Sequence, residues 1–303
     1  MTNTGGSHGD VTGKPVFGLT VTALLLAALV AAFWHTFRAL WSVWQTNEDY
    51  SAGQLVPLAV GYMLWTRRDI FYSRSPGVHS LGIPIVLAGT ALNLLGLYYL
   101  FGSMASLGVI LCINGLALTI LGWRGYRQVW FPFAFLILMA PLPNRLHDKI
   151  MLPLQAMGAK VSVVVLEVTG VPTERFGHVL EVAGYRVAVA EACSGLRMAV
   201  AFLIVAGVMA YLVNRPSWQK AIIIASSVPI ALICNVFRIV FTACLYNAGY
   251  VALAQGLFHD AAGLLMMPIA VALILGELWF MKGVSSGPAD PEVFHSIAPD
   301  TGR

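Results

Sequence analysis

Charged residues are scarce in this chain. Only 11% of its 303 residues are Asp, Glu, Lys or Arg, whereas 58% are hydrophobic and the mean hydropathy is +0.77. An ordinary soluble domain carries about 25% charged residues. The composition therefore excludes a water-soluble enzyme and predicts a single polytopic membrane domain.

Cysteine occurs at only four positions, and no two of them form a Cys-x-x-Cys pair or a metal-ligand spacing. This argues against a disulfide framework, and neither a metal nor another cofactor is predicted. A cysteine in an apolar helix is usually a small buried hydrophobe, which we expect for Cys112, Cys234 and Cys244. Cys193 differs from them because its sequence neighbours are polar.

Apolar runs long enough to span a bilayer recur along the chain. A transmembrane helix needs about 20 residues. We predict an all-α polytopic fold with eight spans, near residues 16–35, 51–66, 81–101, 103–121, 128–141, 194–213, 220–244 and 257–281. The first run is expected to be retained as a span, because it is long and lacks a small-residue cleavage site.

Basic loops alternate along these spans. They follow the second, fourth, sixth and eighth spans and contain, in that order, Arg67, Arg68 and Arg74; Arg124 and Arg127; Arg215 and Lys220; and Lys282. The positive-inside rule places these loops and both chain ends in the cytoplasm. We expect a cytoplasmic tail over 1–15, a transmembrane domain over 16–282 and a disordered cytoplasmic tail over 283–303. Because the basic residues report topology, nucleic acid is not an expected partner.

The segment between the fifth and sixth spans has a different character. Residues 151–170 are apolar, but counting them as a span would break the alternation, and Lys160 and Glu167 are costly in a lipid-exposed helix. We therefore predict an interfacial or re-entrant segment. Two short alternating runs then flank Ala183-Gly184, which predicts an outer hairpin within 174–191.

Polar residues from three remote segments gather at one predicted depth. Cys193 begins the sixth span, and His259 opens the inward-running eighth. Arg238 lies 18 residues beyond Lys220, which is about 27 Å along a helix and reaches the outer side. An ionisable residue within a membrane is by default a candidate for function.

These residue types suit a cysteine nucleophile. A nearby cation and a helix N-terminus both favour the reactive thiolate of Cys193. His259 can take the thiol proton and return it to a leaving amine, and Arg238 can stabilise an oxyanion. Neighbouring residues that could support them, including a glycine that permits close backbone approach, are Glu191, Ser194, Gly195, Arg197, Asn235 and Asp260.

Structural roles remain open for the same residues. Arg238 also fits a side chain that snorkels to the outer headgroups, and His259 fits a hydrogen-bonded interface histidine. Arg197, one turn after Cys193, fits either a supporting group or a topology anchor. In the first outer loop, Glu48 and Asp49 are expected to be solvated charges.

Three motifs follow one another in the order of a known family. They are Glu191-Ala-Cys-Ser-Gly-Leu-Arg197, Asn235-Val-Phe-Arg-Ile239, and His259 with Gly263 after it. Together they resemble the exosortase and archaeosortase family of multi-spanning membrane cysteine transpeptidases. Upstream, the run Tyr50-Ser-Ala-Gly is similar to the family's Tyr-Ser-His-Gly element, with Ala52 in place of the histidine.

This resemblance implies an activity, a location and partners. It implies cleavage of C-terminal sorting signals of the Pro-Glu-Pro type from exported proteins, at the periplasmic face of a bacterial inner membrane. Cys193, Arg238 and His259 would be the catalytic residues, and a thioester would be resolved by a lipid or polysaccharide component. Membrane lipids and the exopolysaccharide machinery are the other implied partners.

Two other functions fit the sequence. One is a non-catalytic component of exopolysaccharide export or assembly, in which the outer polar cluster binds a glycan or lipid head group. The other is an intramembrane hydrolase or acyltransferase with Ser194 as nucleophile. A channel is disfavoured, because the charges cluster at one face and do not line a path through the bilayer.

Overall fold

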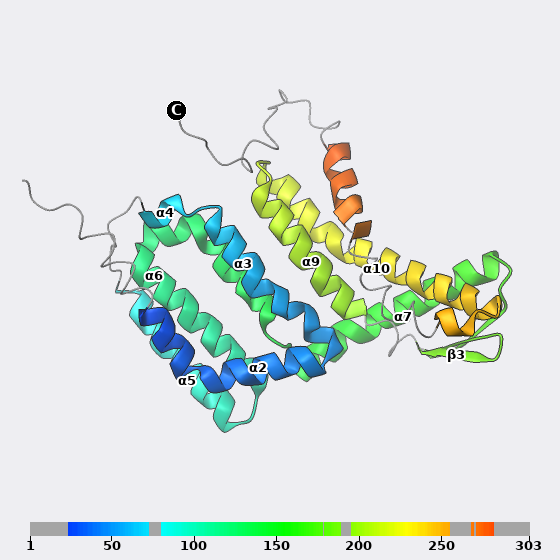
Figure 1. Ribbon diagram of the computed structural model, residues 1–303, viewed down its shortest axis with the longest axis horizontal. Helices are drawn as coiled ribbons and strands as arrows, with labels where there is room; N and C mark the ends of the chain where they lie inside the picture. Colours follow the sequence, from blue (N-terminus) through cyan, green and yellow to red (C-terminus); the bar gives the residue numbers. More distant parts are fainter. Residues whose placement is uncertain are drawn as a thin grey trace, which may run out of the picture. The chain divides into compact units, whose positions relative to one another are not determined.

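The computed structural model describes residues 24–72, 80–177, 179–188, 195–254, 268–269 and 271–281. These residues are mostly helical (Figure 1), as the composition predicts. The chain divides into two compact units, one formed by Met1–Ser42 and Leu64–Ala140 and the other by Val43–Met63 and Pro141–Arg303.

The first unit is built around a helical hairpin of α5 (Gly82–Tyr98) and α6 (Gly102–Phe135). Three glycines of α5, seven residues apart, face α6 at very close range. A Cβ atom added to Gly89 would lie 2.7 Å from the carbonyl oxygen of Gly108, and one added to Gly96 would overlap the backbone nitrogen of Ala105. Small residues allow this backbone approach, which is a common way for membrane helices to associate.

Helix α6 contains a kink directly after the predicted fourth span. Its backbone leaves helical geometry at Gly122, with φ of 65° and ψ of 171°, and again at Val129. Positive φ at Gly122 is accessible because glycine has no Cβ. The kink at Gly122 divides α6 into two helical parts where the boundary between spans 103–121 and 128–141 was predicted, and the 3₁₀-helix η2 (Leu136–Met139) follows the second part.

The first unit also contains helices that precede this hairpin in the chain. The helix Leu24–Ala32 and α2 (Trp34–Thr46) meet at a bend of 71°, near the end of the predicted first span, 16–35. A short helix, α4 (Asp69–Tyr72), precedes the hairpin.

Most of the other described helices belong to the second unit. These are η1 (Glu48–Gln54), α3 (Leu55–Trp65), α7 (Asn144–Val168), α9 (Gly195–Leu212) and α10 (Ser217–Asn247). Helix α10 packs against both α7 and α9. The helix Val271–Met281 joins α9 and α10 through a cluster of buried side chains, Ala206, Ala210, Ile223, Ile274 and Met281.

A small antiparallel sheet completes this unit, with strands β1 (Thr173–Phe176), β2 (Val179–Val182) and β3 (Tyr185–Ala188) in that order. Ala183 and Gly184 connect β2 to β3 with φ of 53° and 78°, the pair of left-handed residues that a type I′ turn requires. The predicted hairpin is confirmed. Strand β1 was not predicted, because Thr-Glu-Arg-Phe lacks an apolar alternation.

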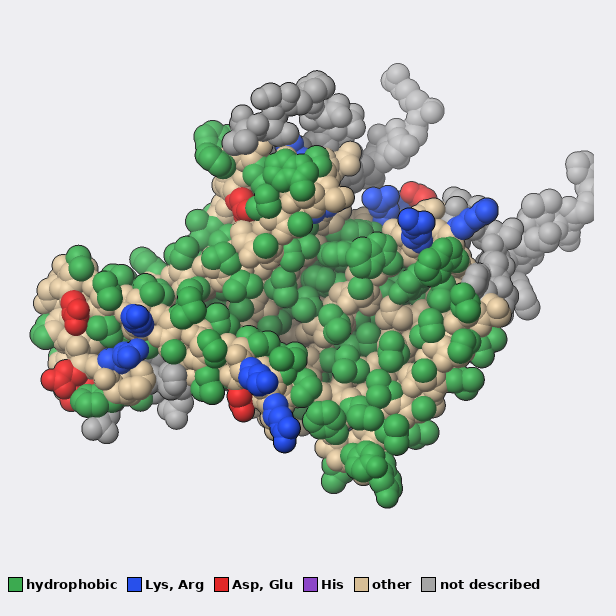
Figure 2. Space-filling model, turned by 180° about the vertical axis from the view of Figure 1, so that it is seen from behind, with side chains coloured by type: hydrophobic (Ala, Val, Ile, Leu, Met, Phe, Trp, Pro, Cys, Tyr) green, Lys and Arg blue, Asp and Glu red, His purple; other side chains and the backbone are tan. Residues whose placement is uncertain are grey.

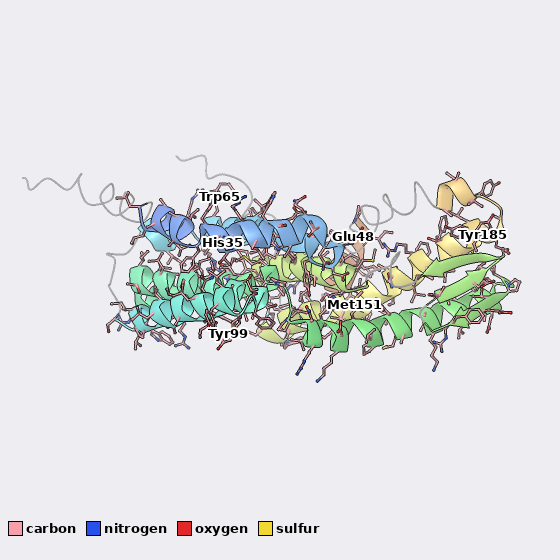
Figure 3. The ribbon with its side chains drawn as sticks, turned by 90° about the horizontal axis from the view of Figure 1, so that it is seen from below. His35, Glu48, Trp65, Tyr99, Met151 and Tyr185 are labelled. Atoms are coloured by element: carbon pink, nitrogen blue, oxygen red, sulfur yellow. The ribbon has the colours of Figure 1, made fainter. Side chains whose placement is uncertain are left out.

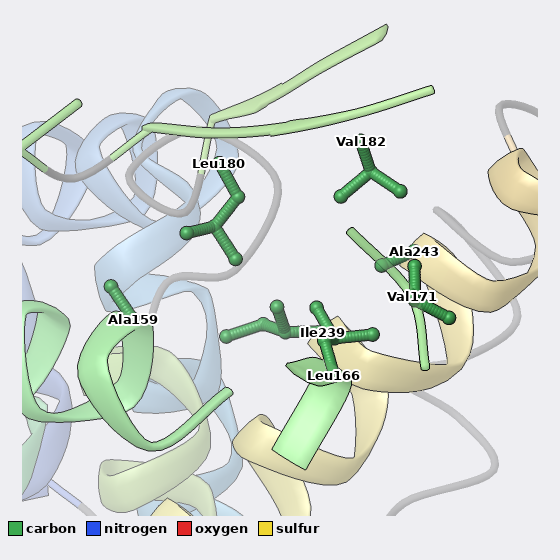
Figure 4. Close-up of a cluster of buried hydrophobic side chains, with 7 residues drawn as sticks. All are labelled: Ala159, Leu166, Val171, Leu180, Val182, Ile239 and Ala243. Carbon is green, nitrogen blue, oxygen red and sulfur yellow. The ribbon is translucent and has the colours of Figure 1, made fainter. Parts of the chain in front are cut away.

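The sheet is anchored on the helices through one of its faces. Leu180 and Val182 of β2 are fully buried in a cluster with residues of α7 and α10 (Figure 4). The other members are Ala159, Leu166, Val171, Ile239 and Ala243.

The described residues include three helices long and apolar enough to cross a membrane, and four if the bent pair is one span. The three are Gly102–Met139, Asn144–Val168 and Ser217–Asn247, and shorter apolar helices are Gly82–Tyr98, Leu196–Leu212 and Val271–Met281. Hydrophobic side chains cover most of the face shown in Figure 2, as contact with lipid requires. The count of eight spans stays a prediction.

Helix α7 contains the segment 151–170, for which we predicted an interfacial or re-entrant position. It is one continuous helix, long and apolar enough to cross a membrane. Lys160 and Glu167 are both exposed on its surface. Its orientation in the membrane stays a prediction.

Candidate functional site

The described residues include only part of the predicted site. Arg197, Asn235 and Arg238 are described, and Gly195 is the first residue of α9, one position after the predicted start of the sixth span. Five predicted residues lie outside the described ranges, namely Glu191, Cys193, Ser194, His259 and Asp260. Whether Cys193, Arg238 and His259 meet therefore stays a prediction.

Arg238 lies in the protein interior, on α10. Its exposed fraction is 2%, equal to that of Asn235 one turn earlier. Helix α7 approaches α10 closely here, since a Cβ atom on Gly158 would lie 3.4 Å from Asn235 Nδ2. Burial within the protein does not fit the alternative in which Arg238 snorkels to the headgroups, because a snorkelling guanidinium lies in water.

Further polar side chains are buried in this region of the second unit. On α7, Gln155 is 4% exposed and Ser162 is fully buried. Among the described residues, Ser162 Oγ and Asn235 Oδ1 have no hydrogen-bond partner. Buried polar atoms normally have hydrogen-bond partners. These two oxygen atoms, on α7 and α10, can therefore each accept a hydrogen bond from a further donor.

The segment η1 brings two carboxylates to different helices. Glu48 Oε2 accepts a hydrogen bond from Arg197 Nη1 of α9 at 3.0 Å; the side chain of Glu48 is labelled in Figure 3. Asp49 Oδ2 lies 3.2 Å from His147 Nε2 of α7. The side chain of Asn47 caps η1 by accepting a hydrogen bond from the Asp49 backbone N–H at 3.0 Å.

His147 connects two acidic residues near the start of α7. Its Nδ1 lies 3.2 Å from Asp148 Oδ1, and its Nε2 faces Asp49. Carboxylates only accept hydrogen bonds, so a protonated imidazole can donate to both. The side chain of His147 is 17% exposed, and the ring of Tyr50 lies 5.7 Å from it, centre to centre.

Tyr50 begins the element in which the chain resembles the family's Tyr-Ser-His-Gly run. Its hydroxyl donates to the Leu142 carbonyl at 3.4 Å. Burial raises the pKa of Tyr50, and the Asp49 carboxylate beside it raises that pKa further. Ala52 is 7% exposed, and η1 packs against α9, so the small residue at this position lies within a close contact.

Sequence reasoning missed part of this arrangement. Glu48 and Asp49 were predicted to be solvated, which is wrong for Asp49, since its side chain is 15% exposed and paired. Glu48 is 61% exposed but also paired. His147 was not singled out; the available signal was the polar run Asn144–Lys149 between two apolar stretches.

The three described cysteines are located as expected for small hydrophobic residues. Cys112 and Cys234 are 1% and 3% exposed, and Cys244 packs against the buried cluster of Figure 4. Within the described ranges, no three His, Cys, Asp or Glu side chains gather closely enough to hold a metal ion.

Comparisons with known proteins bear on the family. The model of the transmembrane exosortase family matches residues 44–276, which include η1, all three sequence motifs and the buried Arg238. Searches of curated proteins and of solved structures found no significant match. Because the match covers most of the chain, this protein belongs to the transmembrane exosortase family.

Proposed function

We propose that this exosortase is a membrane cysteine transpeptidase that cleaves C-terminal sorting signals of exported proteins. The reaction would occur at the periplasmic face of a bacterial inner membrane, with both chain ends in the cytoplasm. The observation that carries the proposal is the burial of Arg238, at 2% exposed, within the Asn235-Val-Phe-Arg-Ile239 motif.

A buried guanidinium supports catalysis for an electrostatic reason. Arginine stays protonated in proteins, and removing it from water is costly unless negative charge compensates it. A charge that develops on a substrate oxygen in a site of low dielectric is therefore strongly stabilised by such a group. We assign Arg238 this role toward the oxyanion of the tetrahedral intermediate.

The other two catalytic roles follow from chemistry. The Cys193 thiolate attacks the scissile carbonyl, forming a carbon–sulfur bond, and His259 holds the thiol proton. As the peptide carbon–nitrogen bond breaks, His259 gives this proton to the leaving amine and a thioester remains. An acceptor nucleophile, such as a hydroxyl or amine of a lipid or polysaccharide component, then attacks the thioester carbonyl and gives its proton to His259. The carbon–sulfur bond breaks and the Cys193 thiolate is released.

Processing of a co-expressed substrate tests the proposal. The substrate is an exported protein with a C-terminal Pro-Glu-Pro sorting signal, and the variants are Cys193→Ala, Arg238→Ala and His259→Ala at matched membrane levels. Cys244→Ala serves as the matched control for cysteine loss. We expect processing by the wild type and by Cys244→Ala, and none by the three site variants.

Other outcomes separate the alternatives. Processing by Cys193→Ala that is lost in Ser194→Ala would replace the thiolate mechanism by a serine mechanism. Intact substrate with the wild type, together with normal exopolysaccharide export in cells carrying Cys193→Ala, would favour the non-catalytic role in export.

A further inference from the structure

Two neighbouring carboxylates of η1 form ion pairs with two different helices. Glu48 pairs with Arg197 on α9 at 3.0 Å, and Asp49 pairs with His147 on α7 at 3.2 Å. Buried Ala52 lies in the same segment, and η1 packs against α9. The N-terminal end of α9 is thus bound to η1 by an ion pair as well as by packing.

This contact lies close in the chain to the proposed nucleophile. Arg197 is the third residue of α9 and follows Cys193 by four positions in the sequence. Because the chain between them is so short, we expect the position of Arg197 to restrict where Cys193 can lie.

We propose that Glu48 is a positioning residue, which sets the location of Cys193 through its ion pair with Arg197. This inference rests on the proposed function. Misplacing a reacting group by about 1 Å can cost about 10²-fold in rate. The Glu48 side chain is 61% exposed, and such pairs contribute little to stability, so its replacement should leave the chain folded.

Three changes at the pair test this role. Glu48→Gln removes the charge at nearly constant shape, Glu48→Lys repels Arg197, and the double variant Glu48→Arg with Arg197→Glu exchanges the two charges. Glu174→Gln, at an exposed carboxylate of β1, is the matched control. Each variant is compared with wild type at equal membrane level and with its Tm measured in detergent.

Two measurements distinguish a failure of the Glu48 proposal from a failure of the proposed transpeptidase function. The first is the rate of processing of the Pro-Glu-Pro substrate. The second is the rate at which a maleimide alkylates Cys193, measured in chains that also carry Cys112→Ala, Cys234→Ala and Cys244→Ala. Alkylation needs no substrate, so it reports on Cys193 even if the wild type processes nothing.

We expect Glu48→Gln to slow both rates about two- to fivefold, the range of an exposed ion pair. Glu48→Lys should slow them more, and the exchanged pair should return within about twofold of wild type with Tm unchanged. Wild-type rates in Glu48→Lys would overturn the proposal. So would an exchanged pair as slow as Glu48→Lys, since Arg197 would then act on the site directly.

Discussion

Asn93 of α5 donates a hydrogen bond to the hydroxyl of Thr36 of α2 at 2.9 Å, across 57 residues of sequence. The same amide group donates to the Ala105 carbonyl of α6, also at 2.9 Å. Both Asn93 and Thr36 are 3% exposed. One buried amide therefore joins three helices of the first unit.

The first prediction concerns this amide. Asn93→Ala removes both hydrogen bonds, and we expect it to lower the free energy of unfolding by about 1–2 kcal/mol. A double-mutant cycle with Thr36→Val isolates the bond between the side chains, with an expected coupling of about 0.6 kcal/mol. Unfolding in detergent measures both values. Additive effects would show that the bond contributes nothing.

The close approach of α5 and α6 makes a second prediction. In Gly89→Ala, the new Cβ would lie 2.7 Å from both Cys112 Sγ and the Gly108 carbonyl oxygen. The helices must separate, and we expect a loss of about 1–3 kcal/mol in stability.

Gly61→Ala on α3 is the control for this change, because a Cβ atom there meets nothing within 4 Å. Alanine is favoured over glycine inside a helix by about 1 kcal/mol, so Tm should rise slightly. The two alanine variants should thus shift Tm in opposite directions, and a fall of equal size in both would contradict the packing argument.

The turn between β2 and β3 is the subject of a third prediction. Ala183 has φ of 53°, which costs a non-glycine residue about 1–2 kcal/mol. Asparagine tolerates this region and is favoured in type I′ turns. We expect Ala183→Asn to slow hydrogen exchange of the amides in 179–188, and Gly184→Ala to accelerate it. Unchanged exchange in both variants would argue against the turn.

A fourth prediction addresses the geometry of the buried guanidinium. Arg238→Lys keeps the charge but loses the planar fork of donors, and we expect processing to fall at least about tenfold at normal membrane level. Arg124→Lys, at an exposed position of the first unit, should process at the wild-type rate. Equal rates for Arg238→Lys and wild type would mean that charge alone is sufficient.

The proposed topology provides a fifth test. In chains whose other three cysteines are alanine, an impermeant maleimide added to intact spheroplasts should label Cys193. It should not label Arg215→Cys in a Cys193→Ala chain until the membrane is opened, because the basic loops are expected in the cytoplasm. The reverse pattern would contradict both the topology and the periplasmic site.

Local pattern was sufficient for several features of this protein. Hydropathy predicted a helical membrane protein because a run of apolar residues must be buried or face lipid wherever it lies. Ala183-Gly184 predicted the hairpin because turn conformation depends on neighbouring residues. The motifs around Cys193, Arg238 and His259 indicated the family, which the match over residues 44–276 confirms.

Other features depend on which helices meet, and no local pattern contains that information. The residues paired with Asp49 and Glu48 are 98 and 149 positions away. The sequence by itself predicted solvated charges at both positions, which is wrong for Asp49, and it allowed Arg238 to lie at a lipid headgroup. Packing between helix faces decided both, because burial and pairing of a charge are set by the neighbours that tertiary structure brings to it.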